Sequence, residues 1–446
     1  MNTTVTKRDG TSVENAIALV LKSVRRITAV EDVPVKDALH RVCAAGLSAG
    51  MDVPHFNKSP LDGYALKSGD TENAAVDNPI ALKAAARVFA GDVFDGVCEN
   101  RQCIRIMTGA MIPSGCDCVI RQEDVELADD DKACADVCSV RGSVLIKQRL
   151  KPNENIIFAG EDIQKGTQLF NGGTVMNSRR LFVLSSLGMQ TVLCYKMPRI
   201  AVLCTGSELV KPGESLPLGK IYNSNETLLG LRLKEIAYEP QFLDIAVDDA
   251  ALVARQIEQI IEEIDVFIST GAVSVGEKDI FHEVFDILGV KKLFWGIAMR
   301  PGGAMLCGIY KDKPLFCLSG PPFAAFVNFE VVVRPALDRI RGVAPACTAG
   351  GSGIHAQRVW SEGGSSPRHN IVRAMLSAEV GRRNFRRFLS GIFDAHTAPC
   401  TVTPNENVRG SRFCSFGDCN CLLDLMPDTD YPAGSFVDVL LLADNW

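Results

Sequence analysis

The stretch Val266-Phe-Ile-Ser-Thr-Gly-Ala-Val-Ser-Val-Gly-Glu-Lys-Asp279 joins an apolar run to a turn of small residues that ends on a carboxylate. An apolar helical pattern follows, with Ile280 and Val284 on one face. The same order occurs earlier, where the apolar run 199–204 leads into Thr205-Gly-Ser-Glu208. A strand that passes through such a turn into a helix presents backbone N–H groups to an anion. The two turns therefore predict one crevice that holds an anionic ligand.

The length and charge of the chain limit its class. The 446 residues exceed what one hydrophobic core usually holds, so we expect two to four domains. Basic residues number 47 against 53 acidic ones, and the net charge of -6 argues against nucleic acid or a membrane surface as partner. No apolar run reaches spanning length, and the first residues lack the apolar core of a signal peptide. We therefore expect a cytoplasmic protein.

Sixteen cysteines and six histidines are scattered along the chain. The densest group, Cys414, Cys419 and Cys421, lacks the paired spacing of a zinc site. The histidines form no metal-binding or triad-like pattern. We interpret the cysteines as reduced and mostly buried thiols.

The pattern of apolar residues changes several times along the chain. Residues 13–45 carry one apolar helical face, and residues 59–147 contain short β-rich runs. A helix is expected at 179–187, with Gly188 as its C-cap. Residues 355–446 again have a β pattern.

Between residues 199 and 341, strands and helices alternate, which is typical of a mostly parallel sheet with helices on both faces. The expected strands are 199–204, 240–245, 265–269, 291–295, 304–309 and 314–318, and the expected helices are 225–237, 249–263, 279–288 and 322–340.

Two common interpretations of the Gly271 turn fail. A P-loop needs Lys directly after its last glycine, whereas Gly276 is followed by Glu277. A nucleophile elbow needs G-x-S-x-G, but residue 272 is Ala where a glycine is required.

Five carboxylates lie in turns rich in Gly and Ser. Each alone is most often a turn residue or a helix N-cap. Together they would repel an anion unless a cation bridges them, and Mg²⁺ binds both carboxylates and phosphates. We therefore expect phosphate chemistry with a divalent metal. The five are Asp62, Asp162, Glu208, Asp248 and Asp279.

The segment Ser59-Pro-Leu-Asp-Gly-Tyr-Ala65 resembles the S-x-x-D-G-Y-A signature of the molybdopterin molybdenumtransferases, the MoeA and gephyrin E-domain family. Other blocks agree in the family's order, so the resemblance covers essentially the whole chain. These blocks are Arg105–Ala110 with Pro113–Asp117 and Gln122-Glu123, Gly160–Gly166, Thr205–Leu209, Gly219–Asn225, Gly271–Asp279 and Ala433-Gly434.

The resemblance implies a multidomain α/β fold in four parts. They are a helical linker region (1–50 and 150–198), a β domain (51–149), a three-layer molybdopterin-binding α/β domain (199–345) and a C-terminal β barrel (346–446). It also implies an elongated homodimer with shared sites, to which a partner subunit contributes Asp62 and Asp162. Molybdopterin adenylyltransferase and apo-molybdoenzymes are further partners that it suggests.

The implied reaction is molybdenum insertion into adenylylated molybdopterin with release of AMP, assisted by Mg²⁺, in molybdenum cofactor biosynthesis. The resemblance assigns residues as follows: Asp62, Asp162, Glu208 and Asp248 to catalysis; Glu208, Asp248 and Asp279 to Mg²⁺; Thr205, Gly206, Ser269, Gly271, Ser274, Gly276, Asp279, Arg300 and Pro301 to the pterin ligand; Arg300, Arg387 and Ser415 to molybdate.

The sequence departs from the family where the family is most basic. The family's W-K-x-x-x-K-P-G-K-P run is here Trp295–Ala304, with Gly296 and Gly303 in place of two lysines and Arg300 as the remaining cation. Arginine is a good oxyanion ligand but does not replace three separate charges. Two alternatives therefore stay open: a molybdopterin carrier or scaffold without metal insertion, and another nucleotide pyrophosphatase or transferase in the same crevice.

Overall fold

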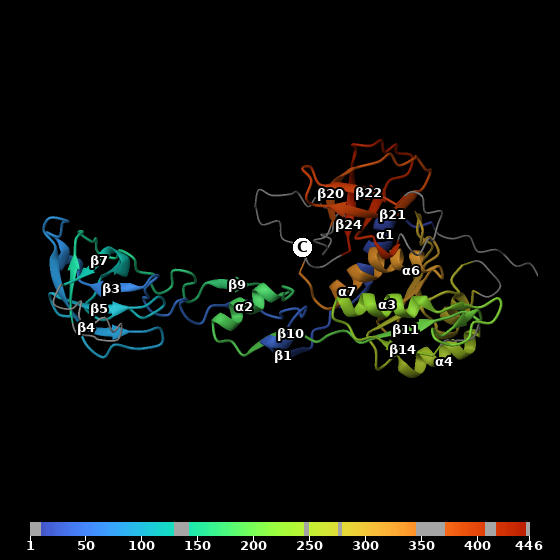
Figure 1. Cartoon of the computed structure of the whole chain (residues 1–446). Helices are drawn as coiled ribbons and strands as arrows, with labels where there is room; N and C mark the ends of the chain where they lie inside the picture. Colours follow the sequence, from blue (N-terminus) through green and yellow to red (C-terminus); the bar gives the residue numbers. More distant parts are fainter. Residues whose placement is uncertain are drawn as a thin grey trace, which may run out of the picture. The chain divides into compact units, whose positions relative to one another are not determined.

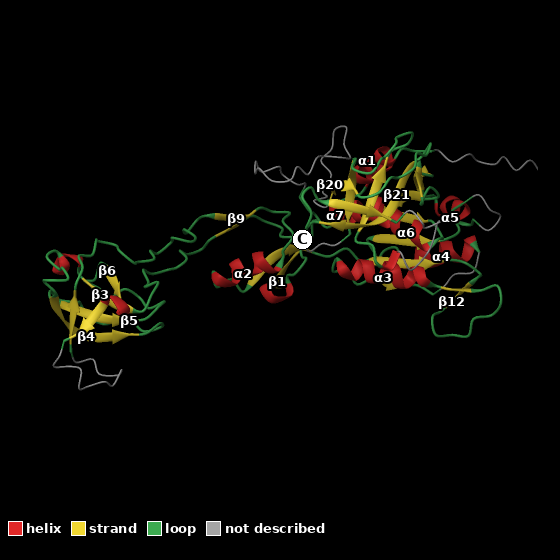
Figure 2. Ribbon diagram, turned by 45° about the horizontal axis from the view of Figure 1, so that its top comes forward, coloured by secondary structure: helices red, strands yellow, loops and turns green. Residues whose placement is uncertain are grey.

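The computed structural model describes residues 10–128, 142–244, 249–274, 279–344, 371–405 and 416–442. The chain folds into two compact units (Figure 1, Figure 2). The larger spans residues 1–45, 172–181 and 191–446, and the smaller spans residues 46–171 and 182–190. No helix within the described ranges is long and apolar enough to cross a membrane. The finer division into four domains stays a prediction.

A six-stranded sheet forms the centre of the larger unit, in the order β14-β11-β15-β19-β18-β16. The first four strands are parallel, and β18 and β16 follow in antiparallel pairing. The mostly parallel sheet is therefore confirmed, with an antiparallel hairpin at one edge. The strands are β11 (Ile200–Cys204), β14 (Gln241–Phe242), β15 (Val266–Thr270), β16 (Lys291–Trp295), β18 (Leu306–Tyr310) and β19 (Lys313–Leu318).

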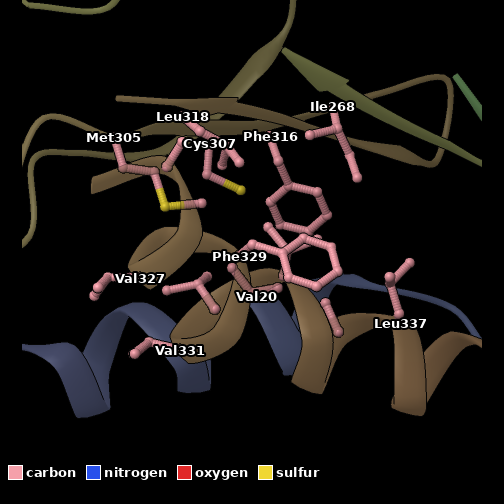
Figure 3. Packing of buried hydrophobic residues seen from close by; sticks show 14 of the residues in the cluster. Val20, Ile268, Met305, Cys307, Phe316, Leu318, Val327, Phe329, Val331 and Leu337 are labelled. Atoms are coloured by element: carbon pink, nitrogen blue, oxygen red, sulfur yellow. The ribbon is translucent and has the colours of Figure 1, made fainter. Parts of the chain in front are cut away.

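Helices cover both faces of this sheet, because successive side chains of a strand point to opposite faces. Ile268 and Phe316 pack against α1 and the helix 322–340 (Figure 3), and the same core includes residues of α3. Phe267 and Leu315 pack against α4 and α5 on the other face. The three-layer arrangement is confirmed. The helices are α1 (Val13–Ser23), α3 (Ser224–Glu235), α4 (Ala250–Ile260), α5 (Phe281–Leu288), α6 (Pro322–Asn328) and α7 (Arg334–Ile340), the last two joined by a π-helical turn, Phe329–Val333.

The prediction of helix over residues 13–45 is wrong beyond Ser23. There the helix ends, with the N–H of Val24 donating to the carbonyl of Val20. Val30–Pro34 instead forms β1, which pairs antiparallel with β10 (Thr191–Tyr195). β-Branched residues favour strands, and proline has no N–H to donate inside a helix.

A closed β barrel lies at the C-terminal end of the larger unit (Figure 1). Its strands follow the order β21-β22-β20-β24-β23, and β23 pairs again with β21. The short strand β17 (Met299–Arg300) adds parallel to β21 and so joins the barrel to the α/β part. The barrel strands are β20 (Ile371–Leu376), β21 (Arg386–Asp394), β22 (Thr401–Pro404), β23 (Cys421–Leu425) and β24 (Phe436–Leu441).

The smaller unit is built on a second six-stranded sheet, in the order β6-β3-β5-β4-β8-β7, and it also contains the antiparallel pair β2-β9. β3 lies between β5 and β6, and its alternating residues enter two cores, Tyr64 one and Ala65 the other. Helix α2 (Ser178–Ser186), whose residues are divided between the two units, ends before Gly188, and the φ of 71° at Gly188 agrees with the expected cap. The strands are β2 (Leu47–Ser48), β3 (Gly63–Leu66), β4 (Ile80–Val88), β5 (Gln102–Ile106), β6 (Cys118–Arg121), β7 (Val125–Leu127), β8 (Ser143–Ile146) and β9 (Gln168–Phe170).

We expect Gly63→Ala to destabilise the smaller unit by about 3 kcal/mol, because overpacking against a rigid neighbour is costly. A Cβ at this position would lie 1.9 Å from the carbonyl oxygen of Ile120 in the adjacent strand. Urea unfolding measures the loss. Gly69→Ala is the matched control, since its Cβ would meet nothing within 4 Å; equal stability of the two variants would contradict the tight β3–β6 contact.

Candidate active site

Three turns meet at one edge of the large sheet. They follow β11, β15 and β19, which are parallel neighbours, so their carboxyl ends share one edge. The amide of Thr205 donates to Thr270 O at 3.0 Å, and the amide of Gly271 donates to Leu318 O at 3.1 Å. A Cβ on Gly271 would lie 2.5 Å from Thr205 O, and φ there is 90°. The close approach of the Thr205 and Gly271 turns therefore needs glycine at this position.

Asn225, in the first turn of α3, connects the third turn to this edge. Its Nδ2 donates to Gly320 O at 2.8 Å, and the residue is buried. Its Oδ1 is also buried and has no hydrogen-bond partner among the described residues. A buried acceptor without a donor is costly, and a ligand N–H is one way to satisfy it. Asn225 ends the block Gly219–Asn225 of the family resemblance, but nothing in the sequence indicates its role.

The acidic residues of this edge come from two of the turns. The carboxylate of Glu208 folds over Gly206, where a Cβ would lie 2.7 Å from each of its oxygens. Asp279 lies just before α5. Asp248 and Gly276 lie outside the described residues. Among the residues that the structure describes, no three His, Cys, Asp or Glu side chains gather as a preformed metal site.

Ser269 and the thiols around it lie beneath this edge. Ser269 is fully buried and lies against the Cys317 thiol. Burial raises the pKa of Cys317 to about 12, and burial also raises the pKa of Cys204. These thiols stay protonated near neutral pH, so they are not nucleophiles here.

A cavity of about 690 Å³ lies between the start of α1, the loop 296–304 and the barrel. Arg300 lines it, with its guanidinium 4.4 Å from the centre of the Phe385 ring. Arg386 also lines it but is buried and bonded to Asp424 through two N–H groups, at 2.7 and 2.6 Å, and to Glu14. Arg386 therefore ties α1 to the barrel.

The two glycine positions of this loop disfavour lysine, Gly296 by its backbone conformation and Gly303 by its close contacts. Gly296 has φ of 89°. A Cβ on Gly303 would lie 2.9 Å from Met299 O and 3.3 Å from Ile297 O. The difference from the family is therefore more than the loss of two charges, because the backbone of this loop also has a shape that suits glycine at both positions. Of the other molybdate candidates, Arg387 donates to Gly381 O at 3.3 Å, and Ser415 lies outside the described residues.

Asn328 connects the crevice to the cavity loop. This side chain is fully buried. Its Oδ1 accepts from the Ser319 amide at 3.1 Å, and its Nδ2 donates to Gly302 O at 2.7 Å. One amide therefore fixes both the third turn and the segment that follows Arg300 and Pro301. The signal in the sequence was a single Asn inside the apolar helix 322–340.

The carboxylates of the smaller unit lie on exposed turns. Asp62 accepts hydrogen bonds from the amide and the hydroxyl of Thr108, at 2.7 and 2.8 Å, and these bonds lower its pKa. Glu123 lies close enough to interact with it, and hydrogen bonding from Gln122 lowers the pKa of Glu123. Both acids are therefore ionised near neutral pH. The amide of Asp162 donates to Val53 O at 3.0 Å.

Comparison with known proteins matches this architecture along the whole chain. The MoeA N-terminal region (domains I and II) matches residues 11–188, and a probable molybdopterin binding domain matches residues 201–339. A molybdopterin molybdenumtransferase of Staphylococcus aureus (strain COL) is 30% identical over 440 residues, which are 98% of this chain and 97% of that protein. The chain belongs to the molybdopterin molybdenumtransferase family.

Other members of the family agree. A molybdopterin molybdenumtransferase of Staphylococcus epidermidis is 30% identical over 99% of this chain and 98% of its own. A molybdopterin biosynthesis MoeA protein from Pyrococcus horikosii has a TM-score of 0.73 at 29% identity, covering 98% of this chain and 99% of that one. A second MoeA structure from Pyrococcus horikoshii OT3 has a TM-score of 0.75 at 24% identity, with 97% and 99% covered, and supports the fold.

The structure brings together only part of the residue set that the family resemblance assigned. Thr205, Gly206 and Gly271 lie in adjoining turns at the sheet edge. Arg300 and Pro301 lie in the cavity loop, which Asn328 connects to that edge. Asp62 and Asp162 belong to the smaller unit. The roles of all these residues remain predictions.

We expect Asn328→Leu to leave the Ser319 amide and the Gly302 carbonyl unpaired, at about 1–3 kcal/mol for each group. Chemical unfolding measures the loss, and hydrogen exchange of the Ser319 amide should become faster. Asn420→Leu is the matched control, because Asn420 similarly bonds Phe393 N and O within the barrel. It should cost similar stability without changing exchange at Ser319; equal changes at Ser319 in both variants would count against the bridge.

Proposed function

We propose that this chain inserts molybdenum into adenylylated molybdopterin and releases AMP, as an enzyme of molybdenum cofactor biosynthesis. Membership of the family supports the reaction. The observation that carries it in this chain is the meeting of three turns with the buried Oδ1 of Asn225 at the edge of the parallel sheet, an atom without a hydrogen-bond partner among the residues that the structure describes. Backbone N–H groups suit a phosphate, and the amide oxygen suits a ring or amino N–H of a pterin.

In this proposal the first two turns bind the pterin phosphate. The amides of Thr205 and Gly271 already donate to Thr270 O and Leu318 O, so these two residues hold the turns together. The remaining N–H groups of the turns, including that of Gly206, would bind the phosphate. Ser274 lies further along the second turn, and Ser269 supports this turn from beneath the edge. Gly276 is assigned to the same ligand in the proposal. The Asn328 bridge keeps the third turn at the same edge.

Mg²⁺ fits the donor set at this edge, because Glu208 and Asp279 carry the hard oxygen ligands that it prefers. Asp248 completes the set in the proposal. When bound, Mg²⁺ would neutralise the negative charge of the phosphates during cleavage. Glu208 and Asp279 would then hold the phosphates through the bound ion instead of repelling them.

Molybdate enters this proposal as substrate in the cavity beside Arg300. Phe385 holds the guanidinium of Arg300, while Arg386 is committed to Asp424 and Glu14. Arg387 and Ser415 would contribute further contacts. Because the loop is shaped around Gly296 and Gly303, we expect weaker molybdate binding than a site with three cations would give.

The remaining acids act from the smaller unit. Asp62 and Asp162 would reach the site of a partner subunit in a homodimer, where the ionised Asp62 can accept a proton from the attacking group or bind metal. We propose that the dimer works in the cytoplasm, receives adenylylated molybdopterin from an adenylyltransferase and passes its product to apo-molybdoenzymes.

The decisive experiment is AMP release from adenylylated molybdopterin by the purified chain. We expect release that requires Mg²⁺ and rises with molybdate, and a product that reconstitutes an apo-molybdoenzyme. Quantifying AMP by chromatography measures the first part. Tight pterin binding without AMP release would instead identify a carrier, and AMP release that ignores molybdate would identify a nucleotide pyrophosphatase.

We expect Asp62→Asn to lower turnover by at least about 100-fold, the usual size of a lost acid–base or ligand group. The amide keeps the shape of the carboxylate, so the fold should be unchanged by circular dichroism. Asp95→Asn, at an exposed carboxylate of the same unit, is the control and should retain full activity. Unchanged turnover in Asp62→Asn would remove this residue from the proposal.

Thr108→Val tests the pKa of Asp62 while leaving the Asp62 side chain in place. The variant loses the hydroxyl donor but keeps the backbone N–H, so the pKa of Asp62 should rise part of the way to its ordinary value. A lowered pKa keeps the carboxylate ionised until more acidic pH. The acid limb of the pH–rate profile should therefore move to higher pH in Thr108→Val, with turnover at neutral pH preserved.

A further inference from the structure

The proposed function leaves unused a group of four cysteines in the smaller unit. They lie on opposite faces of its sheet. Cys103 and Cys118 belong to the core around Leu66, whereas Cys98 and Cys116 pack together in the core around Ile104. All four are free thiols.

Cys103 and Cys118 are too far apart to react with each other. Cys103 in β5 and Cys118 in β6 both pair with Leu66 of β3, from its two sides. Two strand spacings separate their Cα atoms by about 9.5 Å. A disulfide requires less than about 7 Å. This pair therefore provides a control within the same sheet.

Cys98 and Cys116, in contrast, lie on segments that run side by side. Val97 pairs with Ser114, and the amide of Cys98 donates to Ser114 O at 2.8 Å. A Cβ on Gly115 would lie 2.6 Å from Cys98 O, so only glycine allows this approach. The two thiols lie close enough to interact, and the Cys98 thiol also donates to Gln102 O at 3.4 Å.

The surroundings of this pair act differently on the two thiols. The hydrogen bond from Cys116 lowers the pKa of Cys98, and the charge of Lys67 acts in the same direction. Lys67 is held close by Asn100, with Nζ 2.7 Å from Oδ1. The pKa of Cys116 is raised because it is the donor, and burial raises the pKa of Cys103 to about 12. Of these thiols, Cys98 is thus the one suited to attack a mixed disulfide formed on its neighbour Cys116.

We propose that Cys98 and Cys116 are a reversible dithiol–disulfide site, oxidised by exchange with a small-molecule disulfide. Cys116 is partly exposed and Cys98 is buried, so the small disulfide reaches Cys116 first. Cys116 loses its proton, and its thiolate attacks the small disulfide to form a mixed disulfide with release of one small thiolate. Cys98 then loses its proton, and its thiolate attacks the Cys116 sulfur, which releases the second small thiolate; the two small thiolates take up the two protons.

The exchange is balanced. The protein pair loses two electrons and two protons, and the small-molecule disulfide gains both as two small thiols. The closed loop contains β5 and Thr108, the hydrogen-bond partner of Asp62. Oxidation therefore restricts the segment that holds this carboxylate.

The test is a redox titration of the purified full chain in buffers of reduced and oxidised glutathione. After acid quenching and alkylation under denaturing conditions, we expect free thiols to fall by two from sixteen as the buffer becomes oxidising. Mass spectrometry of the digest should find one peptide pair, joined through Cys98 and Cys116, and reduction should restore the full count.

Two variants and two outcomes make the test selective. Cys116→Ser should abolish the loss of thiols, and Cys103→Ser should leave the cross-linked peptide unchanged. The wild-type peptide map decides the matter even if a variant folds poorly. Sixteen free thiols at every potential would overturn the proposal, as would a cross-link confined to other cysteines or to two different chains.

Discussion

The parallel register of β11, β15 and β19 is the constraint on which the crevice depends. Cys204 pairs with Thr270, and Thr270 pairs with Leu318, so three strands end at one level and three turns begin there. A slip of one residue in β15 would turn Ile268 away from the α1 core and Phe267 away from α4 and α5. The two hydrophobic layers therefore fix the register, and the register fixes the site.

Ion pairs connect the parts that this sheet does not reach. Arg386 joins Glu14 of α1 to Asp424 of the barrel, and Arg232 joins Glu330 to the carbonyl of Leu442. Removing one partner of such a buried pair leaves an uncompensated charge, which is far more costly than a lost surface contact. The ion pairs of Arg386 with Glu14 and Asp424 therefore fix the position of the cavity wall beside Arg300.

The alternation of strands and helices between residues 199 and 341 was sufficient to predict the three layers, because both faces of each buried strand are apolar. The sequence could not predict β1, since its pairing with β10 depends on a segment far along the chain. Asn225 and Asn328 were missed for a related reason: an asparagine has no periodic signal, and its importance comes from carbonyls that folding brings to it. At Gly303 the sequence indicated only the loss of a positive charge, whereas the structure shows that close backbone contacts also disfavour a side chain there.

The order of the elements along the chain also determines when the α1 core can form during synthesis. The apolar face of α1, with Val13, Ile17 and Val20, is synthesised long before the residues that it packs against, such as Phe329 and Leu337. The whole smaller unit is made in the interval. The nascent chain must therefore keep an amphipathic helix uncovered until these residues are made, which makes that helix a natural binding segment for a chaperone.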